Sequence, residues 1–397
     1  MVAPPPHYRR EKNWKRWLLG LTEGERGKLE YGPSGEMIVR CEYIPATNSL
    51  TQRVINQLVV ACGMILRVFP KGSIPRKFSP DLVIGTVPAL PTAAVTYLVS
   101  RFLKAPYIID LRDAWPDLLQ NSRDWNRELG KKSLRQKVLE RGPKQLLLRL
   151  VERVLWGVYS QADTMLFTSR YLQESTLDSL RSRGLSTPKS MLVRNVFPTP
   201  QHDVNMSGDL DGPGTMREFR ILYAGTVGRA QNLNNLLEAI AIATRDGVDV
   251  KAKILGKGDA FTHLRSVWSG LTDLVEFKRA VEPEKLSDYY AWADCAVVHL
   301  AEWGALERAV PSKTYELMEN GIFILGAVGG ETAALVRELA AGDVVPPGEP
   351  AALAEKIKEL SKNRHRLGLR NAAQQWVKNE RKKVEEEIIP ILLEKND

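Results

Sequence analysis

Short apolar runs alternate with longer amphipathic stretches along the first half of this 397-residue chain. The runs DLVIGTV (81–87), PYIIDL (106–111) and TMLFTS (164–169) are typical of buried strands. Between them, residues 91–103 and 131–160 have apolar positions at helical spacing. Strands that alternate with helices favour an α/β domain with a largely parallel sheet.

The same pattern restarts at FRILYAGT (219–226) and continues to about residue 328. Each half therefore predicts a separate doubly wound, Rossmann-like domain with its own sheet. The strands predicted in the second half are 219–226, 250–256, 274–279, 295–301 and 322–328, and the helices are 231–245, 259–268, 283–292 and 312–319.

The segment 198–216 separates the two patterns, because it is rich in Pro, Gly, Asp and Ser and has almost no apolar periodicity. We predict an N-terminal domain over 1–197, a linker over 198–216 and a C-terminal domain over 217–375. A charged helix over 376–397 either packs on the N-terminal domain or ends the second one. The opening VAPPPHY looks like the loop after a first strand, so either that strand lies upstream of Met1, which we favour, or the first sheet lacks a central strand.

Composition is that of an ordinary globular protein, with 44% hydrophobic and 26% charged residues. Its three cysteines are far apart, which argues against a disulfide framework or a zinc site and favours a reducing cytoplasm. No apolar run approaches the ~18 residues that would span a bilayer. Charge is uneven: residues 1–200 hold 31 Lys and Arg against 17 Asp and Glu (+14), and residues 201–397 hold 25 against 30 (−5). The first half is thus expected to meet an anionic surface or substrate.

Two glycine-bearing turns follow predicted strands of the second half: GTVGRA (225–230) and GKGD (256–259). Gly225, Gly256 and Gly258 would let a ligand approach the backbone closely, and the following helix starts suit phosphate. Arg229 would add a planar donor fork for the same anion. The alternative is that both turns are tight connections without a ligand.

PSKTYELMENG (311–321) predicts a helix opened by Pro311 and stopped at Asn320-Gly321, with Ser312 as its cap. Glu316 could accept hydrogen bonds from two ribose hydroxyls, and Lys313 could neutralise a diphosphate. The alternative is a surface i, i+3 ion pair between Lys313 and Glu316.

These motifs, taken in order, resemble the retaining glycosyltransferases of family 4, whose GT-B architecture is α/β, with two Rossmann-like domains facing a cleft. The resemblance rests on ILYAGTVGRAQNLNNLLEAI, KILGKGDAFTHL, VEFKRAVEPEKLSDYYAWADCAVV and VPSKTYELMENGIFILGA. RDAWPDLL (112–119) and LVRNVF (192–197) resemble the fucosamine-transferase-like branch, which builds bacterial cell-surface polysaccharides. The resemblance implies that Glu316 binds the ribose of a nucleotide-sugar donor and that Gly225 belongs to the phosphate loop.

The chain departs from the family pattern at two places. Many members have an Arg and a Lys where this chain has Thr226 and Gln231, and Arg229 could substitute for them. Many also have a glutamate eight residues before the ribose glutamate, where this chain has Arg308 next to Glu307. The donor sugar is therefore left open.

The sequence holds no convincing pair of catalytic carboxylates. The resemblance implies that the leaving diphosphate helps to deprotonate the acceptor, while the protein positions the substrates and stabilises the departing charge. We assign the stabilising role to Arg229 and Lys313. Absence of an Asp-x-Asp motif predicts that neither a metal nor a cofactor is required, the nucleotide sugar being a substrate.

On the acceptor side, RDAWPD follows a predicted strand, so Asp113 is a candidate catalytic or acceptor-binding residue with Arg112 beside it. An Arg-Asp pair at a strand end is also a common structural feature. His7, in the Pro-rich first loop, is a weaker acceptor-side candidate.

Residues 131–157 hold eight Lys and Arg against two acids, with apolar residues at near-helical spacing. The pattern favours peripheral docking on an anionic inner membrane surface. A solvated basic face over a core-facing stripe is the alternative, and nucleic-acid binding is disfavoured because aromatic residues are not interleaved with the basic ones.

We therefore predict a glycosyltransferase that moves a hexosyl or N-acetylhexosaminyl group from a nucleotide sugar to a lipid-linked or polysaccharide acceptor, and we expect the donor to be UDP-linked. One alternative is a sugar-nucleotide epimerase of the same architecture, which would need carboxylates near the sugar. Another is a non-catalytic basic protein that binds membranes or nucleic acid.

Overall fold

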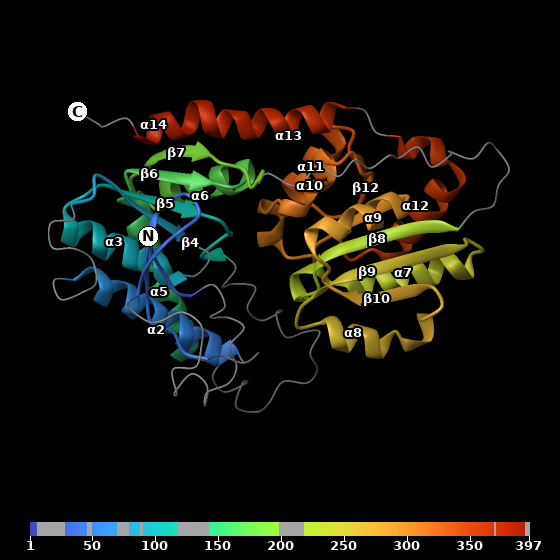
Figure 1. The fold of residues 1–397 in the computed structure, drawn as a ribbon, viewed down its shortest axis with the longest axis horizontal. Coiled ribbons are helices and arrows are strands. Elements are labelled where there is room, and N and C mark those ends of the chain that lie inside the picture. The colour runs from blue at the N-terminus through green and yellow to red at the C-terminus, as the bar shows by residue number, and fades with distance from the viewer. Residues whose placement is uncertain are drawn as a thin grey trace. The chain divides into compact units, whose positions relative to one another are not determined.

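The computed structural model describes residues 1–5, 28–45, 50–69, 79–87, 90–117, 143–197, 218–368 and 371–393. The chain divides into two compact units, whose helices and strands are shown in Figure 1. Unit 1 comprises residues 1–119, 132–167 and 176–191, and unit 2 comprises 120–131, 168–175 and 192–397. The predicted linker 198–216 and His7 lie outside the described residues. Within these residues, no helix is long and apolar enough to cross a membrane.

Unit 1 is built on a four-stranded sheet of order β4-β5-β6-β7, in which β4 and β6 both pair in parallel with β5. The central strand β5 is buried along its whole length, as its apolar sequence predicts. The strands are β4 (Val83–Val87), β5 (Tyr107–Leu111), β6 (Thr164–Phe167) and β7 (Lys189–Leu192), and the helices are α2 (Leu50–Val68), α3 (Leu90–Leu103) and α5 (Pro143–Ser160). The part of the predicted helix 131–160 before Pro143 lies outside the described residues.

A second, three-stranded sheet in unit 1 has the order β1-β3-β2. Its strands are β1 (Val2–Ala3), β2 (Leu29–Tyr31) and β3 (Met37–Arg40), with β1 parallel and β2 antiparallel to β3. The prediction that the opening residues are a loop was wrong at Val2 and Ala3, because their backbone pairs with β3. Helix α6 (Arg170–Ser182) begins in unit 2 and ends in unit 1.

Unit 2 contains a six-stranded sheet of order β10-β9-β8-β11-β12-β13, and every neighbouring pair in it is parallel. Numbered along the unit, this is the Rossmann order 3-2-1-4-5-6, which reverses direction between β8 and β11. The strands are β8 (Phe219–Thr226), β9 (Val250–Lys257), β10 (Val275–Arg279), β11 (Cys295–His299), β12 (Ile324–Ala327) and β13 (Gly342–Val345).

Helices cover both faces of the unit 2 sheet, because neighbouring strand residues point to opposite sides. Ile221 belongs to the apolar core under α7 and α12, and Leu222 belongs to the core under α9, α10, α11 and α13. The helices are α7 (Leu233–Arg245), α8 (Phe261–Val267), α9 (Leu286–Trp292), α10 (Ser312–Glu319), α11 (Gly330–Glu338), α12 (Pro350–Lys362), α13 (Ala372–Lys383) and α14 (Ile389–Leu393), with short helical turns η3 (Arg229–Gln231), η6 (Gly304–Arg308) and η7 (Arg364–Leu367).

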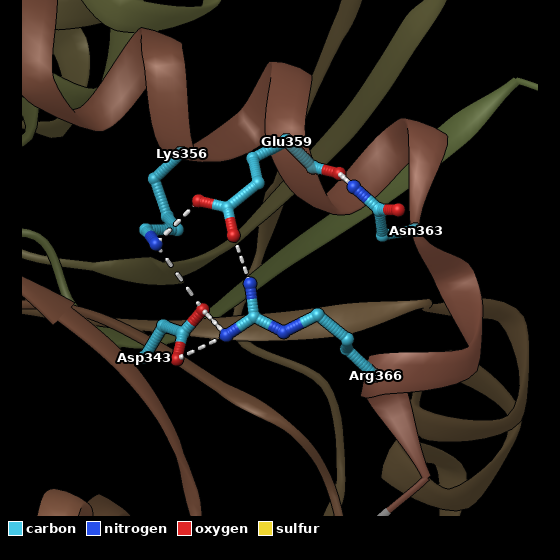
Figure 2. A network of polar contacts seen from close by, with 5 residues as sticks. All are labelled: Asp343, Lys356, Glu359, Asn363 and Arg366. Atoms are coloured by element: carbon cyan, nitrogen blue, oxygen red, sulfur yellow. Dashed lines mark hydrogen bonds and ion pairs between the residues drawn. The ribbon is translucent and has the colours of Figure 1, made fainter.

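The edge strand β13 is fastened to α12 by a closed ring of charges, shown in Figure 2. Arg366 contacts Asp343 at 2.9 Å and also bonds Glu359, while Lys356 contacts Glu359 at 2.5 Å and Asp343 at 3.4 Å. Two acids and two bases therefore alternate, so each charge has two opposite neighbours.

The C-terminal helix packs through α13 against α10, where Ala373 and Val377 enter the core of unit 2. It widens to a π-helix, η8 (Val384–Ile388), before α14. We attribute the wide turn to Pro390, which has no N–H for a regular α-helical bond and crowds the carbonyl one turn earlier.

Candidate functional site

The two glycine-bearing turns lie side by side at the carboxyl edge of the unit 2 sheet. β8 and β9 pair in register, with Gly225 opposite Gly256 and Thr226 opposite Lys257 (Figure 1). This edge adjoins the point where the strand order reverses, which is where ligands bind in open α/β sheets.

The three predicted glycines have different structural roles. A Cβ on Gly256 would lie 2.0 Å from the Gly225 carbonyl oxygen, and one on Gly258 would lie 2.0 Å from the Val227 carbonyl oxygen. These two glycines are therefore required by the close approach of two backbones. A Cβ on Gly225 would meet nothing closer than 3.5 Å, so protein packing does not demand glycine there. Gly225 is exposed at the edge and remains suited to a close ligand.

A pocket of about 270 Å³ opens at this edge. Gly225, Thr226 and Gly256 form one wall with their strand ends, and Val281 and Leu286 form an apolar wall. Lys313 is the cationic side chain of α10 that reaches the lining, and Lys257 contributes from the end of β9. A lining that combines apolar side chains, a cation and exposed backbone suits a ligand with a flat base and an anionic group.

Helix α10 presents Lys313 and Glu316 as predicted, but its start differs from the prediction. Pro311 is the cap and Ser312 is already the first helical residue, without a side-chain capping bond. The sequence prediction of Ser312 as the cap was wrong because the extended Pro311, with φ −59° and ψ 135°, occupies that position. The predicted stop is confirmed, since Asn320 ends the helix and Gly321 has φ +66°.

Lys313, Glu316 and Tyr290 form one polar cluster beside the pocket. Lys313 Nζ donates to Glu316 Oε2 at 2.8 Å, and the Tyr290 hydroxyl donates to Glu316 Oε1 at 2.5 Å. Lys313 Nζ also lies 3.2 Å from the Tyr290 hydroxyl. Burial, reinforced by the Glu316 carboxylate, raises the pKa of Tyr290, so its hydroxyl stays protonated and continues to donate.

The ion pair that the alternative interpretation predicted is therefore present. It is not an isolated surface pair, because both side chains are about four-fifths covered and Lys313 lines the pocket. Sequence reasoning missed Tyr290. Its position in α9, just before β11, carries no motif that would single it out from its neighbour Tyr289.

Arg229 and Gln231 lie together in η3, directly after the β8 turn. The Arg229 guanidinium lies 3.5 Å from the carboxylate of Asp259, so it links the two glycine turns. The loop is also tied to the strand at the reversal point, since the Ala301 amide donates to the Ala230 carbonyl at 2.8 Å. Arg229 does not line the pocket described above.

Arg308 does not line the pocket and instead contacts the segment 168–175. Its guanidinium lies 3.4 Å from the Ser175 hydroxyl, and its carbonyl accepts a bond from Ser169. Glu307, the neighbouring acid, is exposed and lies beside Gly329 at the start of α11.

The acceptor-side candidates belong to unit 1. Asp113 is exposed just after β5. Arg112 forms an ion pair with the buried Asp110, at 2.8 Å. A structural Arg-Asp pair is therefore present at this strand end, and Asp113 stays a candidate.

Two arginines, the buried Arg194 and the partly buried Arg381, contact residues of α10. Arg194 contacts Glu331 at 2.5 Å and the Tyr315 hydroxyl at 3.3 Å, and its guanidinium lies over the Trp376 ring. Arg381 donates two bonds of 2.8 Å to Glu319. Sequence reasoning did not assign a role to either arginine, because their partners are more than 60 residues distant in sequence.

No group of three His, Cys, Asp or Glu that could hold a metal is found among the described residues. Metal independence stays a prediction.

Comparisons with known proteins bear on the class of unit 2. Residues 218–363 match the family model described as Glycosyl transferases group 1. A probable glycosyltransferase, WbjE of Pseudomonas aeruginosa, is 28% identical over 234 residues. That match spans about half of this chain and about half of the relative, 53% of each.

Solved structures extend the likeness to the whole fold. Anabaena Alr3699/HepE, solved in complex with UDP-glucose, has a TM-score of 0.57 at 14% identity and covers 89% of this chain and 86% of its own. Sucrose-phosphate synthase of Thermosynechococcus elongatus has a TM-score of 0.53 at 16% identity, covering 91% and 82%. At these identities the likeness establishes the fold, which confirms the predicted GT-B class with two Rossmann-like domains.

Proposed function

We propose that the protein is a retaining glycosyltransferase that transfers a hexosyl or N-acetylhexosaminyl group from a UDP-sugar to a lipid-linked or polysaccharide acceptor. The observation that carries the proposal is the unit 2 pocket, where strand-end backbone, an apolar wall and the Lys313–Glu316 pair meet. The resemblance to family 4 and to its fucosamine-transferase-like branch supports a role in cell-envelope polysaccharide synthesis. The site of action would be the cytoplasmic face of the membrane.

In this proposal each wall of the pocket takes one part of the donor. Val281 and Leu286 bury the base, and Gly225 allows the diphosphate to approach the backbone. A carboxylate has about four lone-pair positions, so Glu316 can accept two ribose hydroxyls while it keeps the Tyr290 bond. Lys313 then neutralises the charge that develops on the departing diphosphate.

The acceptor would be handled by Asp113 in unit 1, with Arg112 and His7 as further acceptor-side residues. Arg229 would support the diphosphate from the β8 turn. We propose that no metal or cofactor is needed, because Lys313 and Arg229 supply positive charge for the leaving group.

Calorimetric titration with UDP and UDP-sugars tests the donor site. We expect Glu316→Gln to weaken UDP binding about tenfold, since a hydrogen bond to a charged group contributes roughly 1.5–3 kcal/mol. Glu355→Gln, on the exposed surface of α12, is the matched control and should bind UDP as the wild type does. Equal affinity in Glu316→Gln, or no binding of any nucleoside diphosphate by the wild type, would overturn the assignment. Transfer from the tightest-binding UDP-sugar to an isoprenoid-diphosphate sugar then tests the reaction.

A further inference from the structure

Three helices of unit 1 expose large apolar side chains to solvent. On α2 the exposed side chains include Ile55, Leu58, Cys62 and Leu66, and the exposed Phe69 comes directly after the helix. The spacing of three or four residues places them along one side of the helix. On α5 the exposed residues are Leu146, Leu150 and Val154, and on α3 they are Leu98 and Phe102.

These side chains are not needed by the core of unit 1. Helix α2 already buries Val60 and Ala61, and α5 buries Leu155, Trp156 and Tyr159. Each helix therefore has a second apolar side that faces water, with Leu66 and Leu146 exposed by 65% and 72%. Apolar side chains gathered in this way are typical of interaction sites.

The three helices are neighbours in unit 1. Helix α3 packs against both α2 and α5, and the Phe69 and Phe102 rings stack at 4.2 Å where α2 and α3 meet. We call this surface the α2–α3–α5 face; its apolar members are Ile55, Leu58, Leu66, Phe69, Leu98, Phe102, Leu146, Leu150 and Val154.

The charge of the same helices is almost entirely positive. Their sequences hold six Lys and Arg against a single acid, Glu152. Glu152 accepts bonds from Arg183 and from the Trp156 ring, so its charge is compensated. Arg149 and Arg153 are exposed on either side of Leu150, and Arg101 is exposed next to Phe102. Exposed arginines thus lie next to exposed apolar side chains on α3 and α5, whereas Arg67 of α2 pairs with Glu42.

We propose that the α2–α3–α5 face docks the protein on an anionic lipid bilayer. An anionic bilayer offers apolar chains and negative phosphates at the same surface, which matches both properties of this face. The sequence predicted membrane docking through the basic segment 131–157, which includes most of α5. Helices α2 and α3 carry most of the apolar residues of the face, so the proposed surface extends beyond that segment. Docking needs neither nucleotide nor transfer, so it can fail or succeed independently of the proposed enzyme activity.

Flotation with vesicles of phosphatidylcholine containing about one-third phosphatidylglycerol tests the apolar part. We expect wild-type protein to float with these vesicles, to remain in solution with pure phosphatidylcholine, and to dissociate as salt is raised. The double variant Leu58→Ser/Leu66→Ser should lose at least tenfold in vesicle affinity. Val267→Ser is the matched control, because Val267 is 56% exposed on α8 of unit 2. Unchanged UDP affinity in each variant would show that unit 2 is intact.

The charged part is tested with Arg149→Gln/Arg153→Gln. About fivefold in affinity is expected per arginine near the surface. Arg245→Gln, exposed in unit 2, is the control. Equal flotation of the arginine variant and its control would overturn the role of this face.

Cys62 provides a direct probe of insertion. It is exposed within the face, whereas Cys41 and Cys295 are buried, so a thiol-reactive, environment-sensitive dye will label Cys62 first. We expect its emission to shift to the blue with anionic vesicles and to stay unchanged with pure phosphatidylcholine. A blue shift that depends on protein concentration without lipid would show that a second copy covers the face. If the dye already emits in the blue in dilute protein, and vesicles do not change this emission, another part of the chain itself covers the face. Either result would overturn the proposal.

Discussion

At the scale of single residues, the proposed donor site depends on one shared carboxylate. Glu316 accepts one hydrogen bond from the charged ammonium group of Lys313 and one from the neutral hydroxyl of Tyr290. The lysine forms an ion pair with the carboxylate, and the tyrosine fixes its orientation without adding charge. A nucleotide that enters the pocket therefore meets a pre-oriented acceptor next to a cation, the arrangement that reduces the ordering cost of binding.

Asp113 is the acceptor-side residue whose role can be separated from donor binding. We expect Asp113→Asn to lower kcat at least tenfold, as loss of a group that transfers or orients a proton does. UDP affinity should not change, because the pocket residues all belong to unit 2. The measurement is steady-state transfer alongside UDP titration, with Asp81→Asn, exposed just before β4, as the control. Full activity of Asp113→Asn would remove it from the reaction.

Because His299, at the end of β11, is buried, we expect the free energy of unfolding to depend on pH. Burial lowers its pKa to about 4, and the nearby Gln231 backbone offsets only part of this; its Nε2 lies 2.9 Å from the Asn235 amide. The unfolded chain, with a His pKa near 6.5, binds more protons between these values, so stability falls as pH drops from about 6.5 to 4. The loss should approach ~3 kcal/mol.

Urea unfolding at pH 7, 5.5 and 4.5 measures this dependence. His299→Gln should be less sensitive to acid than the wild type by most of that amount. His263→Gln, at an exposed position of α8, should retain the wild-type dependence. Parallel pH profiles for the wild type and His299→Gln would contradict the prediction.

The sequence identified residues that lie within compact motifs and missed those that act across long separations. Lys313, Glu316 and Gly225 were found because a helix start and a strand end are local patterns. Tyr290 meets Glu316 from another helix, and Arg194 reaches Glu331 across 137 positions. Such contacts depend on the strand order of the sheet, which a single sequence specifies only through the complete fold.

At the scale of elements, the meeting of β8 and β9 determines the shape of the site. The strands approach so closely that Gly256 and Gly258 are needed for packing, although the sequence also allowed them a ligand role. The strands themselves were predicted almost residue for residue, since buried parallel strands are continuous apolar runs. The sequence could not predict which glycine is required by packing and which leaves room for a ligand, because that distinction depends on the register of Gly225 against Gly256.

Gly258→Ala tests this interpretation. The new Cβ would lie 2.0 Å from the Val227 carbonyl oxygen, so the turn must move, at a cost of roughly 1–3 kcal/mol. Thermal unfolding should show a Tm lower by several degrees, and UDP should bind more weakly as the β8 turn shifts. Gly270→Ala is the control, because open space surrounds that position. Equal Tm values for the two variants would refute the packing role.

At the scale of the whole molecule, the two proposed surfaces belong to different units. The nucleotide pocket lies in unit 2, and the α2–α3–α5 face lies in unit 1. The charge asymmetry of the sequence follows this division, since the excess of positive charge falls in the first half. Within the acidic half, Lys313, Lys257 and Arg229 supply positive charge near the pocket edge.

Hydrogen exchange with and without UDP shows which unit binds the donor. We expect slower exchange at residues 219–232, 254–260, 286–292 and 311–320, which form or flank the pocket. When the UDP concentration is a hundred times its Kd, segments that can open only after UDP leaves should have a free energy of opening that is higher by up to ~2.7 kcal/mol. Strands β5 and β6 of unit 1 should exchange as before. Protection confined to unit 1 would instead place the donor site in that unit. In Glu316→Gln, protection by UDP should fall in proportion to the lost UDP affinity, because the Glu316 carboxylate contributes to UDP binding and hence to the protection that UDP confers.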